Sequence, residues 1–151
     1  MRIFGRPPLR SGYCAVLIVI GFALAFSGCR GQGKRHSGLP TSAQTVLETA
    51  IEDINAGRYE KLYNEAAPEW RAATSLDESK ATFERLRERL GNAGVRNQQT
   101  AREEQTGAGH TLIVIYQTSF EHGHAMETFT LVDHGGKWQM AKYFVSSTAL
   151  K

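Results

Sequence analysis

The stretch HTLIVIYQTSFEHGHAMETFTLV, residues 110–132, decides the expected fold of this 151-residue chain. Apolar and β-branched side chains alternate with polar ones on both sides of an interruption at His122-Gly123. A period of two residues is typical of strands, and a two-residue interruption with glycine is typical of a hairpin turn. We therefore predict an antiparallel hairpin formed by residues 110–120 and 124–132.

The register of this hairpin predicts which side chains face the interior. With His122-Gly123 as the loop, Thr118 lies opposite Glu127 on a face that is otherwise apolar. Carried through the next turn, the same register places Lys142 beside Glu127. We predict that Thr118, Glu127 and Lys142 form a polar patch beneath the helices, in which Lys142 neutralises the carboxylate.

Helical periodicity precedes the hairpin. Apolar side chains recur every three to four residues in three segments, each followed by a glycine or a proline. The first predicted helix is capped by Thr41 or Ser42, the second starts at Tyr59, and the third starts at Ser75, where Glu78 completes a capping box.

The remaining segments complete the expected architecture. Pro68 ends the second helix or opens a short turn that holds Trp70, and Gly91 ends the third helix. Residues 95–105 predict a polar edge strand, and residues 137–145 predict the closing strand. The expected fold class is therefore α+β, with three N-terminal helices packed on a curved four-stranded antiparallel sheet.

The charge distribution argues against a nucleic-acid partner. The chain has 18 basic and 15 acidic residues, a net charge of +3. The excess lies at the N-terminus, because residues 40–151 contain 12 basic and 15 acidic groups and carry a net charge of −3. We expect no binding to nucleic acid.

The N-terminus predicts export. Three arginines precede the apolar run 13–26, which is followed by Ser27-Gly28-Cys29. This ending resembles the lipobox of bacterial lipoproteins, in which the cysteine is lipidated and becomes the mature N-terminus. Simple secretion through cleavage after Ala23-Leu24-Ala25, or an uncleaved anchor, are the alternatives.

The lipobox and the predicted helices and strands together give the expected domain organisation. It comprises a signal peptide (1–28), lipidated Cys29 with a flexible tether (29–40), one α+β domain (41–147) and a C-terminal tail (148–151). Cys14 lies in the discarded segment, so no intramolecular disulfide can form. Arg30 does not resemble an inner-membrane retention signal, so we expect a lipid-anchored envelope protein on the outer membrane, facing the periplasm.

Several spaced segments resemble one exported bacterial family. They are AGRYEKLYNEAAPEWR (56–71), Arg89-Leu90-Gly91, YQTSF (116–120), METFTL (126–131) and GKWQMAKYFV (136–145). Together they resemble domain-of-unknown-function family 4019, within the cystatin-like or nuclear transport factor 2-like architecture, over residues 41–147. The resemblance implies this fold and little about activity. Lys142 departs from the family, which favours glycine there.

The same architecture often encloses a pocket between helices and sheet. Glu127 is the weak candidate for a catalytic general base, since a buried carboxyl can accept a proton. No histidine joins it on the predicted inner face, which favours a structural role. The candidate pocket-lining residues, which could equally be core, are Tyr59, Tyr63, Trp70, Phe83, Tyr116, Thr118, Glu127, Phe129, Trp138 and Lys142.

The five histidines do not predict a metal site. His122 and His124 flank the hairpin turn, whereas His134 lies about 30 Å away along the strand at ~3.3 Å per residue. His110 falls near His134, but two ligands without a carboxylate or a cysteine make a weak site. We expect no metal and no cofactor, and no nucleotide-binding or hydrolase motif occurs.

Two functions remain. The first is a non-catalytic, lipid-tethered module that binds a partner protein, a second copy of itself or a small apolar ligand at the envelope. The second is a small-pocket hydrolase, isomerase or dehydratase that uses Glu127. The surroundings of Glu127 discriminate between them. A pocket of several hundred Å³ that contains Glu127, with a Tyr or His in reach and no contact with Lys142, would favour the enzyme.

Overall fold

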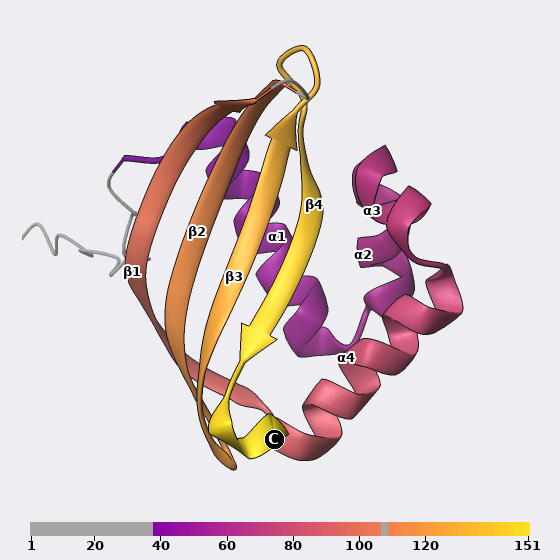
Figure 1. Cartoon of the computed structure of the whole chain (residues 1–151), viewed down its shortest axis with the longest axis vertical. Coiled ribbons are helices and arrows are strands. Elements are labelled where there is room, and N and C mark those ends of the chain that lie inside the picture. The colour runs from indigo at the N-terminus through magenta and orange to yellow at the C-terminus, as the bar shows by residue number, and fades with distance from the viewer. Residues whose placement is uncertain (1–37, 107–108) are drawn as a thin grey trace, which may run out of the picture. The chain divides into compact units, whose positions relative to one another are not determined.

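In the described part of the chain, a four-stranded antiparallel sheet carries the α-helices on one of its faces (Figure 1). The computed structural model describes residues 38–106 and 109–151. The strands lie side by side in chain order, and they are β1 (Ala93–Thr106), β2 (Gly109–Phe120), β3 (Gly123–Asp133) and β4 (Trp138–Ser146). The sheet is curved (Figure 1), and the predicted α+β class is confirmed.

The α-helices number four in the described part of the chain, one more than predicted. They are α1 (Thr41–Ala56), α2 (Tyr59–Glu65), α3 (Pro68–Ala73) and α4 (Leu76–Leu90). The additional helix is α3. It contains Trp70, in the segment for which a short turn was one of the two expectations. Pro68 occupies its first turn, where the fixed φ of proline suits a helix and its missing N–H costs nothing.

The helix ends agree with the sequence except at α1. At α4, the Ser75 hydroxyl accepts a hydrogen bond from the Glu78 N–H at 3.3 Å, and the Glu78 carboxylate accepts one from the Ser75 N–H at 2.9 Å. This capping box confirms the prediction. The predicted cap of α1 by Thr41 or Ser42 is wrong, because Pro40 in an extended conformation holds the cap position and Thr41 already lies inside the helix.

The loop of the central hairpin is Glu121-His122, not His122-Gly123, because Phe120 pairs with Gly123. The His122 N–H donates to the Leu90 carbonyl at 3.0 Å, so the loop is attached to the end of α4. The register therefore shifts by two residues. An even shift keeps every side chain on its predicted face.

Strand β4 contains a bulge that overturns the predicted position of Lys142. Leu131 pairs with Met140 but Thr130 pairs with Lys142, so Ala141 is an extra residue. One extra residue reverses which side chains face the core. Lys142 is consequently exposed on the outer face, and Tyr143 points inward instead.

Strand β1 is the polar edge strand that was predicted, extended by two residues at its start and one at its end. Residues 107–108 of the expected turn to β2 lie outside the described residues. At the other end of the chain, the predicted tail begins with a short 3-10 helix, Thr148–Leu150. The Leu150 carbonyl accepts a hydrogen bond from Arg89 at 3.2 Å, which fastens this segment to α4.

Gly91 ends α4 as predicted, and both its backbone conformation and its surroundings require glycine. Its φ is +76° and its ψ −161°, a region that is essentially restricted to glycine. A Cβ at this position would lie 2.6 Å from the Cβ of Glu121. Gly135 has a similar φ of +67°, but a Cβ added there would meet nothing within 4 Å.

We expect Gly91→Ala to lower the free energy of unfolding by about 3 kcal/mol, the combined cost of backbone strain and steric overlap. Gly135→Ala is the matched control and should cost about 1 kcal/mol, from its positive φ alone. Urea unfolding followed by circular dichroism measures both. Equal losses in the two variants would contradict this account of the end of α4.

Candidate functional site

Glu127, on β3, is the centre of a buried polar cluster. Its side chain is 0% exposed. Oε2 accepts hydrogen bonds from Arg96 Nε at 2.7 Å and from the Thr118 hydroxyl. Oε1 accepts hydrogen bonds from Arg96 Nη2 at 3.3 Å and from the Tyr143 hydroxyl at 2.5 Å. Each carboxylate oxygen therefore has two donors, which fills the acceptor capacity of the group.

The donors to Glu127 come from all three of the other strands of the sheet. Arg96 lies on β1, Thr118 on β2 and Tyr143 on β4. Arg96 Nη2 also donates to the Asn55 side-chain oxygen at 3.1 Å, which connects the cluster to α1. The Arg96 side chain is only 10% exposed, so this ion pair is largely removed from water. A buried ion pair needs such complete hydrogen bonding to offset its desolvation.

The electrostatics keep Tyr143 protonated. Burial raises its pKa well above the ordinary value, and the charge of Glu127 and the hydrogen bond to it raise the pKa further. The hydroxyl therefore remains a donor to the carboxylate. With all four acceptor positions used, Glu127 has no free lone pair for a substrate proton.

The space next to this cluster is small. A cavity of about 40 Å³ is lined by Asn55 and Tyr143, together with residues of α4 and the adjoining strand ends. That volume suits a water molecule and is far below the roughly 300–1,000 Å³ typical of ligand pockets. The described residues thus give Glu127 a titratable neighbour in Tyr143 but no sizeable pocket.

The predicted pairing of Glu127 with Lys142 is wrong, and Arg96 takes the place of that lysine. The bulge at Ala141 turns Lys142 to the outer face. Arg96 and Tyr143 were not predicted as partners of the carboxylate. Arg96 pairs with Thr118 across β1 and β2, so extending the predicted register to the edge strand was the signal that could have found it.

The predicted aromatic residues pack together. Phe83 stacks on Tyr59 with ring centroids 5.0 Å apart and on Tyr143 at 5.4 Å, while Phe129 lies 5.0 Å from Tyr143. The buried core also contains Trp70, Tyr116 and Trp138, with Tyr63 packed against it. Among the predicted lining residues, Trp138 is the one that borders a larger cavity.

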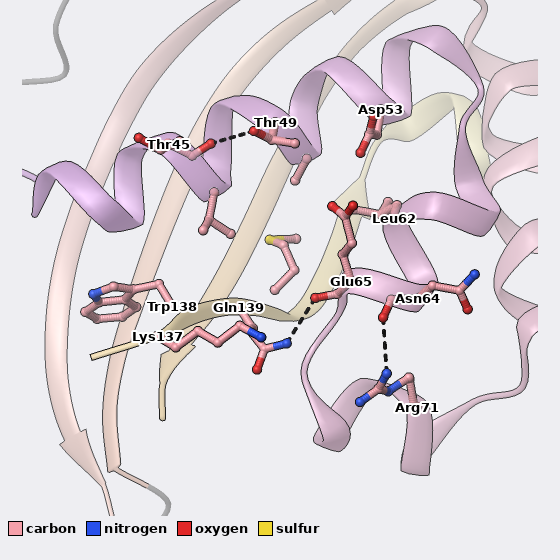
Figure 2. Close-up of a pocket in the computed structure, with 13 residues that line it drawn as sticks. Thr45, Thr49, Asp53, Leu62, Asn64, Glu65, Arg71, Lys137, Trp138 and Gln139 are labelled. Atoms are coloured by element: carbon pink, nitrogen blue, oxygen red, sulfur yellow. Dashed lines mark hydrogen bonds between the residues drawn. The ribbon is translucent and has the colours of Figure 1, made fainter. Parts of the chain in front are cut away.

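This larger cavity has a volume of about 460 Å³ and lies between α1, α2, α3 and β4 (Figure 2). Its apolar surface comes from Val46, Ala50, Leu62, Trp138 and Met140. Ala50, Leu62 and Met140 are core residues with at most 3% of their surface exposed, so the apolar wall belongs to the packed interior. Its size lies within the range of ligand pockets.

Polar residues surround this apolar wall. Asp53 accepts hydrogen bonds from Arg58 Nε and Lys61 Nζ, both at 2.7 Å, and Lys61 also lies 3.3 Å from Glu65. Burial alone would raise the pKa of Asp53, but the hydrogen bonds from Lys61 and Arg58 outweigh it and hold the pKa below the usual value. Arg71 and Lys137 complete the charged part of the lining.

The four histidines in the described residues each contact a different polar partner. His134 contacts Glu69 at 3.1 Å, and His110 contacts Glu103 at 3.1 Å. In residues 38–106 and 109–151, no group of three or more His, Cys, Asp or Glu side chains is arranged to hold a metal ion.

The fold and its two inner sites define a small α+β domain with a structural ion pair and a separate open cavity. A family model described as "Protein of unknown function (DUF4019)" matches residues 46–143. The chain belongs to this family, as the sequence resemblance predicted. The comparison with curated proteins finds no match.

The cluster yields a test of the strand register. Arg96→Met should lower the free energy of unfolding by about 3 kcal/mol or more, because it leaves a buried carboxylate without its counterion. Lys142→Met, the matched control on the outer face, should change it by less than about 0.5 kcal/mol. Denaturant melts at neutral pH measure both.

A double variant separates the charge from the packing. Arg96→Met combined with Glu127→Leu should recover most of the loss, since it removes the uncompensated charge. A loss in Lys142→Met as large as in Arg96→Met would contradict the bulged register.

Proposed function

We propose that this protein is a non-catalytic, lipid-anchored protein of the bacterial cell envelope that binds a small ligand with an apolar part. The ligand occupies the cavity between α1, α2, α3 and β4. One observation carries the proposal: the large cavity and the carboxylate of Glu127 are in different places. The cavity has a volume of about 460 Å³ and an apolar wall, whereas the carboxylate of Glu127 is surrounded by its own hydrogen-bond donors.

The apolar wall supports binding because it is already formed. Leu62 and Met140 belong to the hydrophobic core and are held by neighbours on several elements. The Met140 carbonyl accepts a hydrogen bond from the Ala67 N–H at 2.8 Å, and Gln139 donates to the Glu65 carbonyl at 3.1 Å. These bonds fasten α2 and α3 to β4. A preformed site loses little free energy in ordering itself around a ligand.

The alternative is a hydrolase, isomerase or dehydratase that uses Glu127 as general base. That function requires Glu127 to give up at least one hydrogen bond and requires a substrate-sized opening beside Tyr143. The saturation of the carboxylate and the small volume next to it favour the binding function.

The anchor is part of the same proposal. Cys29 and the apolar run before it lie outside the described residues, and the lipobox resemblance supports their role. Among residues 38–106 and 109–151, no helix is long and apolar enough to cross a bilayer. We place the domain on the periplasmic side of the outer membrane, where a partner protein or a second copy could also bind it.

The anchor is tested by Cys29→Ser in the producing cell. We expect the variant either to leave the membrane fraction or to accumulate as an uncleaved precursor, because the acyl chains can no longer be attached. Fractionation and intact-mass measurement give the result. A Cys29→Ser protein of mature size that still requires detergent for extraction would contradict lipid anchoring.

The cavity is tested by photolabelling the full chain in phosphatidylcholine liposomes with a diazirine derivative of decanol, a neutral probe. We expect labelled peptides to contain Trp138 or Met140. Thr49→Trp should reduce this labelling about tenfold or more, because the indole fills space beside the apolar wall.

The matched control is Thr82→Trp. The Thr49 and Thr82 hydroxyls each donate to the backbone carbonyl four residues earlier, but Thr82 is exposed on α4 and does not line the cavity. The cavity peptides of Thr82→Trp should be labelled to the same extent as those of the original protein. Equal labelling in Thr49→Trp would show that the probe does not occupy this cavity.

A further inference from the structure

We propose that the ligand of this cavity is a single-chain amphiphile with a carboxylate head, whose head is bound by Arg71 and Lys137 and whose chain lies on the apolar wall. This inference rests on the proposed binding function and specifies the chemical class of the ligand. It depends on which charges around the cavity already have partners.

The acidic residues of the lining are each paired with a cation. Asp53 is held by Arg58 and Lys61 at 2.7 Å, and Glu65 lies 3.3 Å from Lys61. These carboxylates therefore attract an incoming cation less than free carboxylates would.

The two remaining cations of the lining have no acidic partner within 4 Å in the described part of the chain. Arg71 Nη1 donates to the Asn64 carbonyl at 3.1 Å, which orients the guanidinium and leaves most of its donors unused. Lys137 directly precedes Trp138 and is exposed. Two unpaired cations beside an apolar wall are complementary to an anionic head joined to an apolar chain.

The positions of these cations agree with such a ligand. Figure 2 shows Arg71 and Lys137 on the side of the cavity opposite Thr45 and Thr49 of α1. A guanidinium and a carboxylate can form two parallel hydrogen bonds, and a lysine ammonium can add a third from another direction. The chain would then lie against Val46, Leu62 and Met140.

The experiment compares diazirine derivatives of decanoic acid and decanol on the full chain in phosphatidylcholine liposomes, at matched free concentrations. We expect the acid to half-saturate the labelling of the Trp138 peptide at a concentration about tenfold lower than the alcohol, from hydrogen bonds to a charged group. Lengthening the acid by one methylene should lower that concentration about fourfold.

The variants assign the head-group site. Arg71→Met and Lys137→Met should each reduce the preference for the acid to about threefold or less. Lys142→Met, which removes an exposed cation on the outer face, should leave the preference unchanged. Both lining cations are exposed, and circular dichroism melts of each variant verify folding.

The outcomes are distinguishable. Equal half-saturation by acid and alcohol, with labelling still lost in Thr49→Trp, would overturn the carboxylate while leaving the binding function intact. An acid preference that persists in both Arg71→Met and Lys137→Met would overturn the assigned head-group site. No labelling of the cavity peptides by either probe would overturn the proposed function itself.

Discussion

The ion pair between Glu127 and Arg96 is the interaction on which the arrangement of the sheet depends. A carboxylate that is 0% exposed must find all of its hydrogen-bond partners within the protein. Those partners come from β1, β2 and β4, and Arg96 extends the network to α1 through Asn55. A slip of any strand by one residue would turn either Glu127 or one of its donors to the outer face. The cluster therefore selects one register for the whole sheet.

The domain has two inner regions with different chemistry. Around Glu127, charge and hydrogen bonds are matched within the protein, and the adjacent space is about 40 Å³. At the junction of α2 and α3 with β4, hydrogen bonds from the Ala67 N–H and the Gln139 side chain hold the helices against the strand, beside a cavity of about 460 Å³. Helix α1 takes part in both, since Asn55 contacts Arg96 and Thr49 lines the cavity. The larger cavity thus lies apart from the carboxylate of Glu127.

Much of the fold could be predicted because local patterns determine it. The inner-face residues of β2 and β3 were assigned correctly even though the hairpin loop was misplaced, because the error was two residues and the strand period is two. The capping box at Ser75 depends only on neighbouring residues, and the stop at Gly91 is indicated by the glycine itself, so both were also correct. The site was harder to predict, because Arg96 is 31 residues from Glu127 and its position depends on the pairing of β1.

The sequence by itself determined the α+β class, the inner face of the hairpin and the burial of Glu127, because each follows from local periodicity. Only the tertiary structure decided which cation pairs with that acid. The bulge at Ala141 exchanges Lys142 for Tyr143 on the inner face, and its sole trace in the sequence is that Trp138 and Met140 are out of phase with Tyr143 and Val145. The cavity likewise depends on how α2 and α3 pack against β4. Such contacts join residues distant in the chain, and no local pattern specifies them.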